Sequence, residues 1–143
     1  MKKGLIGLVA LCVMFILTGC GTETLTCTMS QDESGMTMNQ EAVVTFENNE
    51  VTKMRMNVDV EVDETYSSYI GMMESMLESQ FTQYSDNGAE VDVSSSDNKI
   101  NVSIDMDVKN MTDEQKENLG MEDVYGSKDA TKKELEEQGY TCK

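Results

Sequence analysis

The chain has 143 residues, with 11 Lys and Arg against 27 Asp and Glu and no His, Pro or Trp, and its formal net charge is −16. This length suits a single domain. The negative charge argues against binding to nucleic acid or to an anionic lipid surface, because both partners are negatively charged themselves. The absence of His excludes Ser–His and Cys–His catalysis, His-ligated zinc and a histidine pH switch.

The N-terminus is typical of a signal peptide. Two lysines precede an apolar run over residues 5–17, which is too short to cross a membrane because a spanning helix needs about 20 residues. Residues 17–20 read Leu-Thr-Gly-Cys and resemble a bacterial lipobox. The resemblance implies that Cys20 receives a diacylglyceryl group and that residues 1–19 are removed. The alternative is an ordinary secretory signal followed by a chance cysteine.

Lipidation would place the protein on the extracytoplasmic side of the cell membrane. Two acyl chains give stable anchoring where one is marginal. Cleavage removes two lysines and leaves nine basic residues against 27 acidic ones, so the net charge of the mature chain becomes −18. We expect residues 20–24 to form a lipidated tether and residues 25–143 to form one domain.

Two further cysteines remain in the predicted domain. Cys27 and Cys142 form an even pair near its two ends, in a compartment that permits disulfides. We expect them to form a structural disulfide. A redox or metal-binding role is the alternative, but the chain has no C-x-x-C spacing to support it.

Period-two alternation predicts three strands in the first half of the domain. They cover residues 25–30, 36–47 and 53–62, with turn residues at 32–35 and 48–50. Gln40 is the one polar residue on the apolar side of the second strand. The apolar side of the third strand carries Met54, Met56, Val58, Val60 and Val62.

The pattern then changes to steps of three and four residues, which predicts an amphipathic helix over residues 64–84 with Asp63 as its N-cap. Two more strands follow, at residues 89–93 and 100–109. Thr112 and Gln115 have the spacing of a capping box for a short helix, and a last helix should start near Asp129 and end before Gly139.

The order of elements predicts an α+β fold. We expect an antiparallel sheet of about five strands in the order β-β-β-α-β-β-α-α. The long amphipathic helix should pack on one face, because the sheet is the only large partner for its apolar stripe.

At this level the chain resembles the YehR-like family of small bacterial lipoproteins, whose domain has no assigned function. The resemblance rests on the lipobox, the order of strands and helix, the Val-Thr-Lys start of the third strand at residues 51–53, and the Lys-Lys-Glu-Leu-Glu-Glu-Gln-Gly-Tyr close at residues 132–140. It brings no catalytic or binding residues with it.

Methionine is the most unusual component. Eleven of the 13 Met lie in the mature chain, and two pairs are spaced M-x-M on predicted strands: Met36 with Met38, and Met54 with Met56. We expect these side chains to lie on the core face, the usual use of a flexible apolar residue. One alternative is a loosely packed face that adapts to an apolar ligand or a partner helix. Another is a metal site, because thioethers suit Cu(I).

Acidic side chains are the other candidate for chemistry. Asp59, Glu61 and Asp63 share one strand face, as do Asp105 and Asp107, and carboxylates suit Ca²⁺ or Mg²⁺. No dedicated metal-binding loop is visible, so we expect a solvated face or weak, salt-sensitive contacts with a basic protein. Hydrolysis by paired carboxylates would need a cleft that a domain of this size has little room for.

The sequence therefore predicts a membrane-anchored, non-catalytic binding or interaction module of the cell envelope. Its partners would be the membrane, through the lipid on Cys20, and a basic envelope protein or a small ligand, without nucleic acid. The sequence indicates no cofactor. The alternative function is a metal-handling lipoprotein that uses Met thioethers or acidic clusters.

Overall fold

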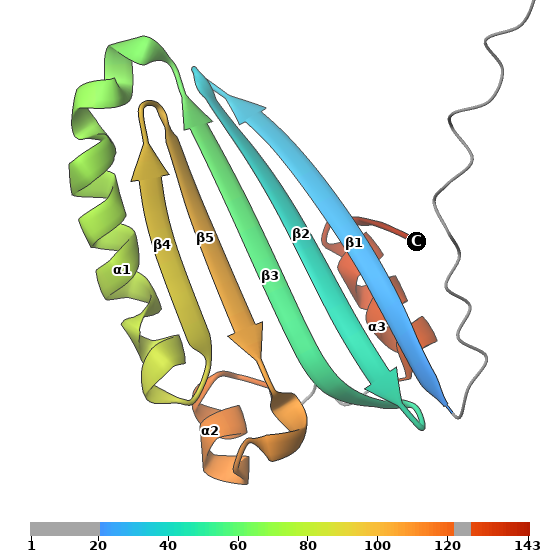
Figure 1. Cartoon of the computed structure of the whole chain (residues 1–143). Helices are drawn as coiled ribbons and strands as arrows, with labels where there is room; N and C mark the ends of the chain where they lie inside the picture. The colour runs from blue at the N-terminus through green and yellow to red at the C-terminus, as the bar shows by residue number, and fades with distance from the viewer. Residues whose placement is uncertain (1–20, 122–126) are drawn as a thin grey trace, which may run out of the picture.

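A computed structural model describes residues 21–121 and 127–143 (Figure 1). The predicted signal peptide and Cys20 lie outside the described residues. The strands are β1 (Thr22–Glu33), β2 (Met36–Glu47), β3 (Glu50–Val62), β4 (Glu90–Ser96), β5 (Lys99–Met106) and β6 (Thr141–Cys142). The helices are α1 (Ile70–Asp86), α2 (Asp113–Asn118) and α3 (Lys128–Glu137), with 3₁₀ helices η1 (Glu64–Tyr69) and η2 (Val108–Asn110).

The strands form one antiparallel six-stranded sheet in the order β4-β5-β3-β2-β1-β6. The α+β class predicted from the sequence is confirmed, but the sheet has six strands where about five were expected. The additional strand, β6, has two residues and pairs with β1. A strand this short carries no alternating pattern that a sequence could display. β1 also begins at Thr22, so it includes three residues expected to belong to the tether.

Tight turns hold β1, β2 and β3 in a meander. Asn48 and Asn49 join β2 to β3 with φ angles of 52° and 66°. Positive φ at both central residues of a two-residue loop matches the right-handed twist of the flanking strands, and Asn tolerates it well. The hairpin predicted at these residues is therefore confirmed.

The connection between β3 and α1 differs from the sequence prediction. Residues 64–84 were expected to form one helix capped by Asp63, but a 3₁₀ helix, η1, precedes α1, and the Asp63 side chain makes no capping hydrogen bond. The Ser67 hydroxyl donates to the Glu64 carbonyl at 2.7 Å. This bond spans three residues, which is the spacing of a 3₁₀ turn.

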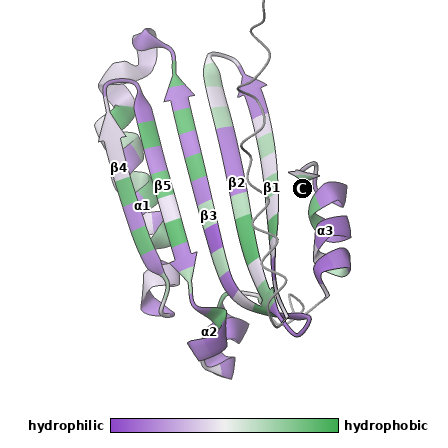
Figure 2. Ribbon diagram, turned by 45° about the vertical axis from the view of Figure 1, so that its right-hand side comes forward, coloured by the Kyte–Doolittle hydropathy of each residue, from purple (hydrophilic) through white to green (hydrophobic). Residues whose placement is uncertain are grey.

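The helices α1 and α3 lie on the same face of the sheet, which we call the inner face (Figures 1 and 2). α1 packs mainly on β4 and β5, and α3 on β1 and β6. The opposite, outer face carries polar side chains that alternate with the apolar ones along each strand (Figure 2).

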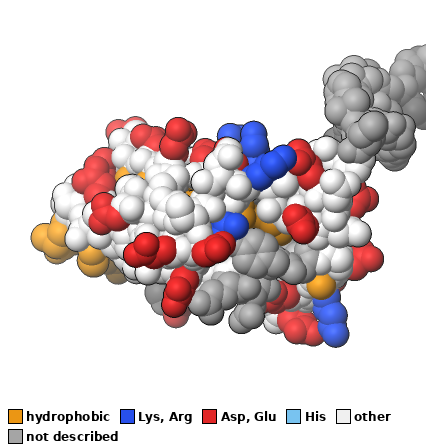
Figure 3. All heavy atoms as spheres, turned by 90° about the horizontal axis from the view of Figure 1, so that it is seen from below, with side chains coloured by type: hydrophobic (Ala, Val, Ile, Leu, Met, Phe, Trp, Pro, Cys, Tyr) orange, Lys and Arg blue, Asp and Glu red, His pale blue; other side chains and the backbone are white. Residues whose placement is uncertain are grey.

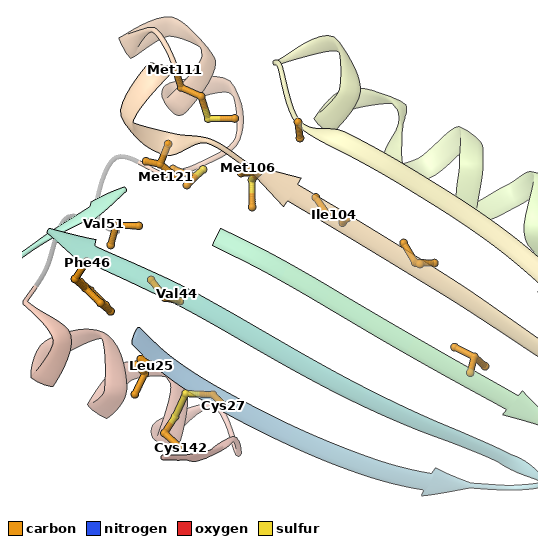
Figure 4. Packing of buried hydrophobic residues seen from close by; sticks show 14 of the residues in the cluster. Leu25, Cys27, Val44, Phe46, Val51, Ile104, Met106, Met111, Met121 and Cys142 are labelled. Atoms are coloured by element: carbon orange, nitrogen blue, oxygen red, sulfur yellow. A yellow bond between two sulfur atoms is a disulfide. The ribbon is translucent and has the colours of Figure 1, made fainter. Parts of the chain in front are cut away.

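A group of buried side chains lies at the end of the sheet where β1 begins and β5 ends. Met106 of β5 meets Met111 and Met121, which flank α2, and Phe46 lies beside Val51 (Figure 4). α2 begins with the predicted capping box: the Gln115 amide N–H donates to the Thr112 hydroxyl, and the Thr112 N–H donates to the Gln115 side chain. This end of the inner face is thereby closed by protein.

Candidate functional site

The inner face is covered unevenly. Because α1 lies over β4 and β5 and α3 over β1 and β6, the inner sides of β2 and β3 lie between the two helices. Figure 2 shows α1 and α3 on opposite sides of this central region. In the described part of the chain, neither α1 nor α3 packs mainly on β2 or β3, and the 3₁₀ helices η1 and η2 contact β3 only near its ends.

The side chains of this central region are only partly buried. We call them the methionine face: Met36, Met38, Met54, Met56 and Val58. They contact the buried core, as the alternation predicted. Their burial is incomplete, however, whereas Met106, Met111 and Met121 are at most 8% exposed. The adaptable, loosely packed alternative thus describes these Met better than a closed core does.

One flank of α1 continues the methionine face. Glu74 lies on the opposite flank of α1 and is not part of the methionine face. Its carboxylate accepts a hydrogen bond from Ser95 on the edge strand β4 at 2.5 Å. By helical periodicity, Met73 and Met76 lie on the other flank, toward β3, and Tyr69, the last residue of η1, directly precedes α1. Met76 is 62% exposed and Tyr69 is 55% exposed, although both side chains are large and apolar. Hydrophobic side chains gather at the surface on the α1 side in Figure 3.

The C-terminal tail bounds the methionine face on its other side. The Tyr140 hydroxyl donates to the Gln40 side-chain oxygen at 2.6 Å, and the Gln40 amide donates to Met38 Sδ at 3.1 Å. Gln40, the polar exception on the apolar side of β2, is therefore satisfied. Burial raises the pKa of the Tyr140 hydroxyl.

The two M-x-M pairs do not form one metal site. In the β2–β3 register, Met38 lies opposite Val60 and Met56 lies opposite Ala42. The two Met are thus four residues apart along the ladder, about 13 Å at ~3.3 Å per residue. Each pair shares a face, as predicted, but the four thioethers are too far apart to converge on a single Cu(I) ion.

The acidic residues of the outer face are largely engaged by their neighbours. Asn101 donates to Asp59 at 2.6 Å, Lys99 lies 3.2 Å from Glu61, and Arg55 donates to Asp105 at 2.5 Å. Asp107 accepts from Asn110 at 2.7 Å. Within residues 21–121 and 127–143, no group of three or more acidic or cysteine side chains is arranged to hold a metal ion.

The cysteines predicted to pair lie together. Cys27 on β1 and Cys142 on β6 are directly opposite each other, with the Sγ atoms 1.98 Å apart (Figure 4). Both side chains are buried. The pair fastens the C-terminal tail, and with it Tyr140, against the sheet.

None of the helices described here has the length and apolar character needed to cross a membrane. No protein-family model matches the sequence, and no curated protein matches it.

Two solved structures resemble the fold. The NMR structure of a protein from Streptococcus pneumoniae TIGR4 superposes with a TM-score of 0.59 at 13% identity, covering 100% of this chain and 96% of that one. The NMR structure of the Escherichia coli YehR protein superposes with a TM-score of 0.55 at 11% identity, covering 85% of this chain and 92% of that one. The YehR-like fold expected from the sequence is therefore confirmed. Identities this low show the fold alone.

Sequence reasoning missed the exposed flank of α1. The signal was present, because the apolar stripe of the predicted helix was unusually wide. It included Tyr69 and Met76, and Met72 lies next to it at 69% exposure. A helix that packs only on a sheet needs a narrower stripe.

Proposed function

We propose that this protein is a lipid-anchored envelope protein that binds an apolar helix of a basic partner protein on its methionine face. The observation that carries the proposal is the partly exposed apolar region between α1 and α3. Sheet faces are ordinarily covered by another layer because apolar surface is costly in water, at about 25 cal/mol per Å².

The spacing of the covering helices favours a helix as the occupant. α1 lies over the β4–β5 pair and α3 over the β1–β6 pair, so their axes are separated by about four strand spacings, ~19 Å at ~4.8 Å each. Packed helices lie ~8–10 Å apart, so two such spacings span ~16–20 Å. One additional helix would complete the layer.

The chemistry of the surface also suits a helix. Methionine side chains are flexible and polarizable, and they adapt to varied apolar partners. Met76 and Tyr69 would contact the side of the bound helix that faces α1, while Met56 and Val58 would contact the side that lies on the sheet. The side chains of this surface are largely apolar, and the proposal assigns them binding and no catalytic step.

Charge favours a basic partner. The mature chain would carry a net charge of −18, and α1 contains no Lys or Arg. Such a field accelerates the approach of cationic partners and disfavours acidic ones. It also disfavours a second copy of this chain as the occupant.

The lipid anchor would orient this surface. β1 begins at Thr22, two residues after Cys20, so the domain would lie within roughly 10 Å of the headgroups at ~3.5 Å per residue. Met36 and Met38 lie toward the opposite end of the sheet, beside the β1–β2 turn. They would therefore face away from the membrane.

Anchoring is tested by replacing Cys20 with Ser and fractionating cells. We expect the variant to leave the membrane fraction or to remain unprocessed. A cleaved mature chain that still fractionated with the membrane would rule out anchoring through Cys20.

Binding is tested with a synthetic amphipathic helix of Leu and Lys, about five turns long, with Leu at three- and four-residue steps. The matched control peptide has the same composition in an order that removes the apolar face. We expect the patterned peptide to bind at least about tenfold more tightly, because only it can bury an apolar stripe.

Variants locate the binding. Met56→Gln with Met76→Gln should remove the preference for the patterned peptide, while Ser103→Gln on the outer face should keep it. Equal binding of both peptides, unaffected by the methionine variants, would mean charge attraction without a site and would contradict the proposal.

A further inference from the structure

The outer face contains a hollow of about 520 Å³ near the end of the sheet where β5 finishes. Its lining includes Val43, Thr45, Lys53, Arg55, Glu90, Asp105 and Asp107. The volume lies in the range of small-molecule sites, ~300–1,000 Å³. The charged side chains of this hollow leave the face opposite the methionine face. Met54, a member of the methionine face, also borders the hollow, but Met56 and Met76, whose variants test helix binding, do not.

The charges in the hollow are separated by sign. Lys53 and Arg55 are two positions apart on β3, so their side chains point to the same face of the sheet, about 6.6 Å apart. The register places Asp105 of β5 opposite Arg55, and Glu90 of β4 opposite Asp105. One side of the hollow is therefore cationic and the other is anionic. In the view from below, Lys and Arg side chains gather near the middle of the molecule, with acidic side chains around them (Figure 3).

Much of this charge has no partner within the protein. Arg55 Nε donates to Asp105, but the side chains of Lys53 and Glu90 make no ion pair or hydrogen bond in residues 21–121 and 127–143. Elsewhere on the same face, the corresponding pair Lys99–Glu61 is closed at 3.2 Å. Among the described residues of this face, the hollow therefore keeps charges of both signs available.

We infer that this hollow binds a small zwitterion of the α-amino acid or short-peptide class. The ligand carboxylate would meet Lys53 and the free guanidinium nitrogens of Arg55, a group whose shape matches a carboxylate. The ligand ammonium would meet Glu90 and Asp105. An apolar ligand side chain would contact Val43.

The same charges disfavour the simpler alternatives. A free anion would be attracted by Lys53 and Arg55 but repelled by three carboxylates in the same hollow. A lone cation would face the opposite conflict. A ligand that carries both signs at a spacing of a few ångströms satisfies both sides at once.

The experiment is a calorimetric titration of the full chain in detergent micelles with four probes: L-leucine, dileucine, N-acetyl-leucine and leucinamide. We expect leucine or dileucine to bind, and the two blocked analogues to bind about tenfold more weakly, because each lacks one charged hydrogen bond. Lys53→Ala and Glu90→Ala should each weaken binding by about the same factor. Lys99→Ala, on the same face outside the hollow, should leave it unchanged.

Three results would overturn the inference. Absence of binding by both leucine and dileucine would exclude a zwitterion site. N-acetyl-leucine binding as tightly as leucine would indicate an anion site, and leucinamide doing so would indicate a cation site. An unchanged ¹H–¹⁵N spectrum outside the hollow verifies that each variant is folded. The methionine-face variants should leave this binding intact, which separates the two proposals.

Discussion

The Tyr140 hydroxyl and the Gln40 side-chain oxygen lie 100 residues apart in the chain and 2.6 Å apart in space. This hydrogen bond joins the segment after α3 to the centre of the sheet. It also supplies the partner that Gln40 needs on an otherwise apolar side of β2. The contact therefore fixes one boundary of the methionine face.

Replacing Tyr140 with Phe should change how stability depends on pH. Burial raises the pKa of Tyr140 above its ordinary value of 10.0, so the phenol stays neutral in the folded chain at pH values where it has ionised in the unfolded chain. Its stabilising contribution is fully present below pH 10.0 and is lost as the pH rises through the folded pKa.

Urea denaturation of the wild-type protein and of the Tyr140→Phe variant, between neutral pH and about pH 11, tests this prediction. The upper limit lies roughly one pH unit above the ordinary pKa of Tyr. We expect the free energy of unfolding of the Tyr140→Phe variant to fall less steeply over the alkaline part of the range. Identical slopes would show that ionisation of Tyr140 is not linked to folding.

The loss of folding stability on truncating Met106 or Met56 to Ala should distinguish the buried part of the core from the partly exposed methionine face. Met106 is 7% exposed, so Met106→Ala should cost about 2–5 kcal/mol of stability, the usual range for a buried Met. Met56 is only partly buried, so Met56→Ala should cost about half as much, because fewer contacts are lost. Chemical denaturation measures both, and equal costs would mean that Met56 belongs to a closed core.

Oxidation should follow the same division. Dilute hydrogen peroxide should convert Met72 and Met76 to sulfoxides first, because they are 69% and 62% exposed. Met36, Met38 and Met56 should follow, and Met111 and Met121 should react last. Peptide mass spectrometry at successive times gives the order. Early oxidation of Met111 or Met121 in folded protein would contradict the packing at the α2 end.

The cysteine pair should be oxidised in protein recovered from its native compartment. Cys27 and Cys142 are separated by 115 positions in the sequence. A bridge over a loop this long contributes at most ~4–5 kcal/mol in the chain-entropy model. Mass spectrometry without reductant should find the linked peptides, and two free thiols would contradict the prediction.

Reduction should loosen the tail locally before the domain unfolds. β6 has only two residues, and its flanking contacts include mutual backbone hydrogen bonds between Thr26 and Lys143. Hydrogen exchange at these two amides should accelerate in reductant, while exchange in β3 stays slow.

Local pattern was sufficient for much of this fold. Strict alternation over β3 predicted both the strand and its inner side chains, and the capping box predicted the start of α2. The same local rules could not supply β6, which is two residues long and is held by Cys142. They also could not show that η1 would replace the first turns of the long helix.

The candidate site was harder to predict because it depends on helix placement. Alternation shows which face of a strand is apolar, but not how much of that face a helix covers. The order of strands puts β5 between β3 and β4, which moves α1 away from β2 and leaves Met36 and Met38 partly exposed. Long-range topology therefore decides which Met are core and which are available.

The most direct test of the methionine face uses protein labelled with ¹³C at the Met methyl groups, titrated with the patterned Leu/Lys helix and followed by NMR. We expect the methyl signals of Met36, Met38, Met56 and Met76 to shift in a saturable way, while those of Met106, Met111 and Met121 remain in place. Shifts confined to other positions, or no shift at a peptide concentration that binds the protein, would contradict the account.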